Sequence, residues 1–107
     1  MTTPSFTNAT ANAVGTTETL IFTASNNAIV IGYSITNVTT ATVPVSVKLW
    51  KSTGNVQLQS NVRVSANDSL HLPQGNKIVL KGGDSITVTS QVNSSVDVAF
   101  SIMQGVL

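Results

Sequence analysis

The chain has 107 residues and a formal net charge of +1, because four Asp and Glu nearly balance five Lys and Arg. Charged residues make up only 8% of it, against about 25% in typical soluble domains, so it lacks the basic field that binds nucleic acid or anionic lipid. The absence of cysteine excludes disulfide frameworks, thiolate zinc sites and thiol nucleophiles. The length allows one domain, and the abundant Ser, Thr and Asn favour strands and turns.

The first fifteen residues are polar and show no clear periodicity. Their only notable anchors are Pro4 and Phe6. We therefore expect an extended arm over residues 1–15, followed by one domain over residues 16–107, with the alternative that the arm pairs as an outer strand of its own domain. No basic segment precedes an apolar one, and no apolar run has the length of a membrane span, which predicts a soluble chain made in the cytosol.

The first strongly apolar segment reads AIVIGYSI, at residues 28–35. It is apolar on both faces at its start and then alternates, which predicts a central strand that is buried on both sides. We expect Ile29, Ile31, Tyr33 and Ile35 to share its inward face, with Gly32 and Ser34 on the other.

Two further segments alternate with a period of two. Val43, Val45, Val47 and Leu49 predict one face of a strand, and Pro44 places that strand at an edge or marks its beginning. In the next segment we expect four aliphatic residues to point inward: Val56, Leu58, Val62 and Val64.

The C-terminal half repeats the same pattern around Ile86 and Val88 and from Val96 to Ile102. Turn signals recur about every ten residues, including STGN at 52–55, PQGN at 73–76 and GGD at 82–84. No segment has helical periodicity. The pattern predicts an all-β fold, a single antiparallel β-sandwich of about eight short strands with Greek-key or jelly-roll connections.

The sequence contains few residues that could act in catalysis or bind a metal. His71 is the only histidine, and its position between Leu70 and Leu72 predicts an exposed side chain. Asp68 and Asp84 fit turns, where carboxylates accept backbone hydrogen bonds. We expect no catalytic residue, no cofactor and no metal site, and therefore no enzyme.

Trp50 is the residue best suited to recognition. It alternates with the inward set, so it points outward, close to Lys48 and Lys51. An outward Trp on a strand suits a protein contact or sugar stacking, and the alternative is that it covers the open end of its own sandwich.

Most of the chain, from residue 29 to residue 103, resembles small bacteriophage virion proteins. The resemblance is carried by YSITNVTTATVPVSVKLW, by VRVSANDSLHL and by GNKIVLKGGDSITVTSQVNSSVDVAFSIM. In these proteins a KIVL strand, a GDSI turn and an SSVDV strand close a compact β-sandwich.

The resemblance implies a structural subunit of the virion, made in the host cytoplasm. Capsid decoration (cement) is the leading role, and a neck or tail component is the alternative; a carbohydrate-binding module is the alternative from another class. The implied partners are the major capsid protein or other virion proteins, without nucleic acid or membrane. A homo-oligomer is expected, with a trimer suggested by analogy. The expected contact residues are Pro4, Phe6, Lys48, Trp50 and Lys51.

Overall fold

The computed structural model describes residues 5–71 and 77–104. The described residues form nine β-strands and no helix. The strands are β1 (Ser5–Val14), β2 (Thr19–Thr23), β3 (Ala28–Asn37), β4 (Val43–Lys51), β5 (Gly54–Val64), β6 (Ser69–His71), β7 (Ile78–Leu80), β8 (Ser85–Ser90) and β9 (Val96–Gln104).

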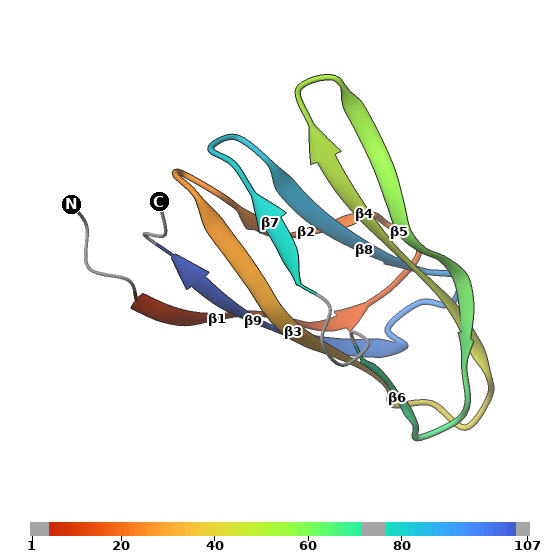
Figure 1. Cartoon of the computed structure of the whole chain (residues 1–107). Helices are drawn as coiled ribbons and strands as arrows, with labels where there is room; N and C mark the ends of the chain where they lie inside the picture. Colours follow the sequence, from red (N-terminus) through yellow and green to blue (C-terminus); the bar gives the residue numbers. More distant parts are fainter. Residues whose placement is uncertain (1–4, 72–76, 105–107) are drawn as a thin grey trace.

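The strands form two antiparallel sheets that pack face to face (Figure 1). Sheet A has the order β1-β9-β3-β6, with β7 also paired to β3, and sheet B has the order β2-β8-β4-β5. The pairs are nested along the chain: β4 pairs with β5, β3 with β6 and β7, β2 with β8, and β1 with β9. This is the connectivity of a jelly roll, so the predicted all-β sandwich is confirmed.

The core lies between the two sheets and consists of the inward residues of both. Its largest fully buried side chains include Phe100, Ile35, Leu80, Ile86 and Ile102. Tyr33 stacks on Phe100 with ring centroids 4.9 Å apart, and its hydroxyl accepts a hydrogen bond from Gln59 at the rim. The alternating aliphatic positions of β4, β8 and β9 all lie in this core, as their period of two predicts.

Pro44 is the second residue of β4. Of the two expected positions, at an edge strand or at the beginning of a strand, the structure has the second. Strand β4 pairs with both β5 and β8 and is therefore central in sheet B. The missing N–H of Pro44 costs the sheet nothing at this position, because the pairing with β8 starts at Val45.

A bulge in β3 overturns the expected facing of its first residues. Val30 pairs with Ile102 and Gly32 with Ser101, which leaves Ile31 as an extra residue without a partner on β9. Val30, Tyr33 and Ile35 therefore point inward, whereas Ile29 and Ile31 point outward, contrary to the prediction. An extra residue in one strand reverses the alternation beyond it.

Strand β5 also departs from strict alternation. Its register against β4 shifts twice, between Val45 and Val47 and again between Val47 and Lys48. Val64 is buried, and Val56 lies opposite the inward Leu49, so both are on the predicted face, although Val56 near the start of β5 is 51% exposed. Two shifts bring Gln59 to the inward side, where it meets Tyr33.

The segment after residue 4 is a strand. β1 pairs antiparallel with β9 along most of its length, from Ser5 opposite Gln104 to Val14 opposite Val96. Its end is fixed to the turn between β8 and β9, because Ser95 donates its N–H to the Val14 carbonyl and Ser90 donates to that of Gly15. The structure thus has the second of the two expected forms, an outer strand of its own domain.

Asn37 is the largest polar side chain in the core and is completely buried. Its Nδ2 donates to the carbonyls of Ala41 (2.7 Å) and Val64 (2.9 Å), and its Oδ1 accepts from the N–H (2.8 Å) and the hydroxyl (2.7 Å) of Thr39. All four hydrogen-bonding positions of the amide are therefore satisfied. This one side chain joins the end of β3 to the end of β5 and to the loop between β3 and β4.

Replacing Asn37 with alanine should destabilise the fold. Asn37→Ala leaves a buried Val64 carbonyl and the Thr39 N–H without partners, so we expect the free energy of unfolding to fall by about 3 kcal/mol. Urea denaturation followed by tryptophan fluorescence measures this change. The exposed Asn55→Ala on β5 is the control, with an expected change below about 0.5 kcal/mol; equal effects of the two substitutions would contradict the role of Asn37.

Candidate interaction surface

The structure places the expected contact residues on opposite sheets. Phe6 lies on the outer face of sheet A and is 74% exposed. Lys48 and Trp50 lie on the outer face of sheet B, and Lys51 ends β4. Pro4 lies outside the described residues. The residues therefore do not form one site, since the thickness of the sandwich separates Phe6 from the other described ones.

Trp50 points outward, as expected, but it is engaged within its own chain. Its Nε1 donates to Glu18 Oε2 (2.9 Å) and to Thr87 Oγ1 (3.0 Å), and the Thr87 hydroxyl donates to the same Glu18 oxygen. The Lys48 ammonium lies 5.7 Å from the centre of the indole ring. The hydrogen bond from Thr87, with that from Trp50 and the charge of Lys48, lowers the pKa of Glu18. Trp50 thus ties β4, β8 and the start of β2 together.

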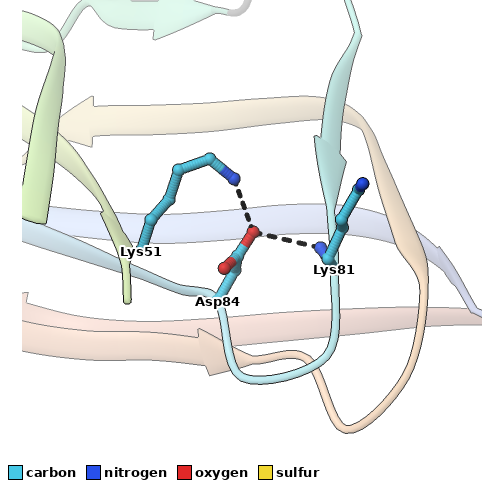
Figure 2. A network of polar contacts seen from close by, with 3 residues as sticks. All are labelled: Lys51, Lys81 and Asp84. Carbon is cyan, nitrogen blue, oxygen red and sulfur yellow. Dashed lines mark hydrogen bonds and ion pairs between the residues drawn. The ribbon is translucent and has the colours of Figure 1, made fainter. Parts of the chain in front are cut away.

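Lys51 and Asp84 form an ion pair at one end of sheet B (Figure 2). Asp84 Oδ2 accepts from Lys51 Nζ (2.8 Å) and from the backbone N–H of Lys81 (3.1 Å). Figure 2 shows that the Lys81 side chain points away from this carboxylate. The Lys51 hydrogen bond, followed by that of the Lys81 N–H, lowers the pKa of Asp84. Asp84 therefore has the expected turn role and also fastens the β7–β8 turn to β4.

The turn itself depends on glycine. Gly83 has φ of +95°, a conformation that a side chain would strain. Its N–H donates to the Ala24 carbonyl, and the Ala24 N–H donates to the Asp84 carbonyl. The GGD sequence thus joins the β7–β8 turn to the connection between β2 and β3.

Apart from Leu20 on β2, which lies opposite Thr87 and is 59% exposed, the outer face of sheet B is polar and largely satisfied by its own contacts. Besides the Trp50 cluster, Ser46 accepts from the Asn61 N–H, and Gln91 donates to the Asn61 side chain. Arg63 and Lys48 add charge to this face. Many polar groups of this surface are already bonded within the chain, so a partner would have to displace favourable contacts.

The outer face of sheet A is of the opposite kind. One transverse row of side chains crosses four strands, from Phe6 on β1 to Met103 on β9, Ile29 on β3 and Val79 on β7. We call these four residues the apolar row. Phe6 and Val79 are 74% and 60% exposed, and Ile31 adds a further exposed side chain beside the row.

The rest of the sheet A face is small and almost uncharged. Among the described outward residues of its strands only Asp97 carries a formal charge, and its carboxylate accepts a hydrogen bond from the Ala13 N–H (2.9 Å). Two exposed lysines, Lys77 and Lys81, flank β7 just outside the strand. The remaining outward residues are Asn8, Thr10, Asn12, Gly32, Ser34, Thr36, Ser69, His71, Ala99 and Ser101. An apolar group with few charges around it is the composition of the centre of a protein interface.

Of the apolar row, the sequence singled out only Phe6 as an expected contact residue. Ile29 was assigned to the core because the bulge at Ile31 was not foreseen, although a glycine inside a strand, here Gly32, is a known signal of a bulge. Met103 and Val79 come from strands whose order in the sheet is set by long-range pairing. Only that order brings them beside Ile29.

The structure offers no group of side chains arranged for catalysis among its described residues. His71 is exposed and lies on the outer face of sheet A opposite Ser34, as expected. Asp68 Oδ1 accepts from the Ser69 N–H in a turn, again as expected. The described part of the chain has no cluster of His, Cys, Asp and Glu that could hold a metal ion, and no helix that could cross a membrane.

Comparison with known proteins yields a likeness of fold. No family model and no curated protein matches the chain. Among solved structures, a chain of the T13 particle of IBDV, infectious bursal disease virus, matches over 94% of this protein with a TM-score of 0.60 and 10% identity. The match covers 30% of that viral chain, so this protein spans less than a third of its length.

Two other matches are weaker. A chain of the Gx strain of the same virus has a TM-score of 0.46 and 14% identity, with 94% of this chain and 32% of the viral one covered. A disulfide-linked pilus of Bacillus endospore appendages has a TM-score of 0.47 and 17% identity, covering 94% and 83%. The match to the T13 particle thus shows a likeness of fold alone, that of an all-β sandwich.

The Asp84 ion pair should make stability depend on pH in acid. Because folding lowers the pKa of Asp84 below its ordinary value of 3.8, its contribution is present above about pH 4 and is lost as the pH falls through the lowered value. We expect the urea midpoint of the wild type to fall between pH 5 and pH 2, and to fall less in Asp84→Asn.

The same titration in two lysine variants separates the causes. Lys51→Met removes the first cause of the shift and should also reduce the pH dependence. Lys81→Met is the matched control, because Lys81 acts chiefly through its backbone N–H, and should keep the wild-type profile. A steep acid loss retained in Asp84→Asn would show that other groups control it.

Proposed function

We propose that this protein is a non-enzymatic structural subunit of a bacteriophage particle. In this proposal it acts as a capsid decoration (cement) protein that binds the assembled head. The likeness of fold to part of a virus-particle chain and the resemblance of residues 29–103 to small phage virion proteins both support it. The described residues also offer no catalytic arrangement that would argue for an enzyme.

The observation that carries the proposal is the contrast between the two outer faces. Sheet B bonds its own polar side chains, whereas sheet A presents the apolar row on a nearly uncharged surface. Neighbouring strands are about 4.8 Å apart and residues about 3.4 Å apart along a strand, so β1, β9, β3 and the two short strands β6 and β7 together give a face of roughly 600 Å². A standard interface buries about 800 Å² on each partner, so this face is of suitable but modest size.

Stabilisation of the head would follow from mass action. A subunit that binds the assembled shell and not its dissociated components lowers the free energy of the assembled state. Many copies on a symmetric shell would each contribute a modest contact. The homo-oligomer implied by the resemblance would multiply that contact through avidity.

Of the described residues that were expected to contact a partner, this proposal keeps only Phe6. Phe6, as the most exposed member of the apolar row, remains the contact residue on sheet A. Lys48, Trp50 and Lys51 are engaged within the chain and stabilise sheet B. The carbohydrate-binding alternative loses support for the same reason, because the indole N–H is already bonded and a lysine lies over its ring.

The number of copies in purified virions distinguishes a decoration role from a neck or tail role. Quantitative mass spectrometry should give a ratio to the major capsid protein within a few-fold of one, because a decoration protein repeats with the capsid lattice. A handful of copies per particle would assign the protein to the neck or tail. Complete absence from virions would refute a structural role.

A charge placed in the middle of each outer face tests which face binds. Ser101→Lys on β9 puts a charge beside the apolar row, and we expect at least a tenfold loss of binding to particles assembled without this protein, because the charge would be desolvated. Thr89→Lys, central on the outer face of sheet B, is the matched control and should bind normally.

Truncation of the Phe6 side chain tests its role as a contact residue. Phe6→Ala should weaken binding by about tenfold, because it removes the most exposed apolar side chain of the row from the contact. Equal occupancy by Phe6→Ala, Ser101→Lys and wild type would show that sheet A is not the bound face.

A further inference from the structure

Strand β1 has a free edge. It pairs with β9 on one side, and none of the described residues pairs with it on the other. The strand is ten residues long, contains no charged residue and no proline, and keeps a regular register from Ser5 to Ala11. Its unpaired N–H and C=O groups on that side form a template for another strand.

The other edges of the two sheets are protected. Sheet A ends on its far side in β6 and β7, which have three residues each. In sheet B, β2 has five residues and a register shift at its middle, and β5 has two register shifts and carries Arg63. Short strands, bulges and edge charges all hinder edge-to-edge pairing. β1 has a register shift too, but only near its end, between Ala11 and Val14. Of the four edges, only β1 combines a regular stretch of this length, from Ser5 to Ala11, with the absence of charge.

We propose that two copies of this chain associate by antiparallel pairing of β1 with β1 about a two-fold axis. An antiparallel pair of identical strands is self-complementary, which is what a two-fold contact requires. The absence of charge on β1 means that pairing like with like brings no repulsion. The result is one continuous sheet made of sheet A from both copies.

The side chains of β1 suit such a pair. Thr7, Ala9 and Ala11 point toward the core and are half-buried, whereas Asn8 and Thr10 point outward and are exposed. When Ala9 opposes Ala9 of the second copy, Asn8 opposes Thr10 and Thr7 opposes Ala11, so inward residues meet inward ones. Small side chains at all these positions allow the strands to approach without a clash.

The pairing does not depend on the proposed function, but it would strengthen it. Both copies would hold their sheet A faces in one continuous surface and so double the area offered to a partner. If the protein is found in virions but sediments as a monomer, only the pairing is refuted. A dimeric chain that is absent from virions would refute only the proposed function.

Sedimentation of the purified chain tests the pairing directly. At concentrations rising to about 1 mM, which reaches weak protein association, we expect the wild type to shift to twice the 11.1 kDa mass of the chain. The variant Asn8→Glu with Thr10→Glu places like charges across the strand pair, and its dimer should dissociate at least tenfold more readily. Added salt should restore part of this loss, because the charges are exposed.

The matched control carries the same two charges on the other long edge strand. Asn55→Glu with Gln57→Glu on β5 changes exposed residues of sheet B and should leave the dimer as in the wild type. Thermal unfolding of both variants shows whether each one retains the fold. A monomeric wild type, a trimer, or an equal effect of the two variants would overturn the pairing.

Cross-linking gives a second test that leaves the strand uncharged. The chain has no cysteine, so Asn8→Cys and Thr10→Cys each introduce a single thiol. If the pairing is centred on residue 8, Asn8→Cys forms a disulfide with its own copy; if it is centred on residue 10, Thr10→Cys does so. If it is centred on residue 9, the disulfide forms between the two variants when they are mixed. Absence of a disulfide in all three samples, with the fold intact, would also overturn the proposal.

Discussion

The pairing of β3 with β9 is the constraint on which the rest of the structure depends. These strands join the first half of the chain to its last residues and form the centre of sheet A. The bulge at Ile31 within this ladder decides which side chains enter the core. Val30, Tyr33 and Ile35 pack against Phe100 and its neighbours, and Ile29 is turned outward. The core and the apolar row are therefore two consequences of one extra residue.

Side-chain hydrogen bonds and ion pairs are more numerous on sheet B than on the outer face of sheet A. On sheet B, the Trp50 cluster and the Asp84 ion pair fasten strands and turns that are far apart in sequence. Inside, Asn37 closes the end of the sandwich. On sheet A, the described outer face has only two side-chain hydrogen bonds, from Ala13 to Asp97 and between Thr36 and Ser69. Association is least costly where few polar groups must lose partners.

The fold class was predictable from the sequence because a period of two in β4, β8 and β9 and turn residues such as GGD act locally. The facing of Ile29 was not, because the bulge is fixed by pairing with Ser101 and Ile102 about seventy residues later. Trp50 could be placed outward, but its partner Glu18 could not be named. The apolar row likewise needs the strand order, which no local pattern contains.

The size of the sheet A face links the two proposals. One copy offers roughly 600 Å², somewhat less than a standard contact uses on each side. Pairing through β1 would place two such faces in one surface, with a Phe6 from each copy near the centre, because β1 lies at the margin where the copies would meet (Figure 1). The chain would then gain by symmetry the area that the sheet A face of one copy does not provide alone. Leaving β1 uncharged exposes an edge that most proteins protect, and that exposure is useful only if another strand covers it.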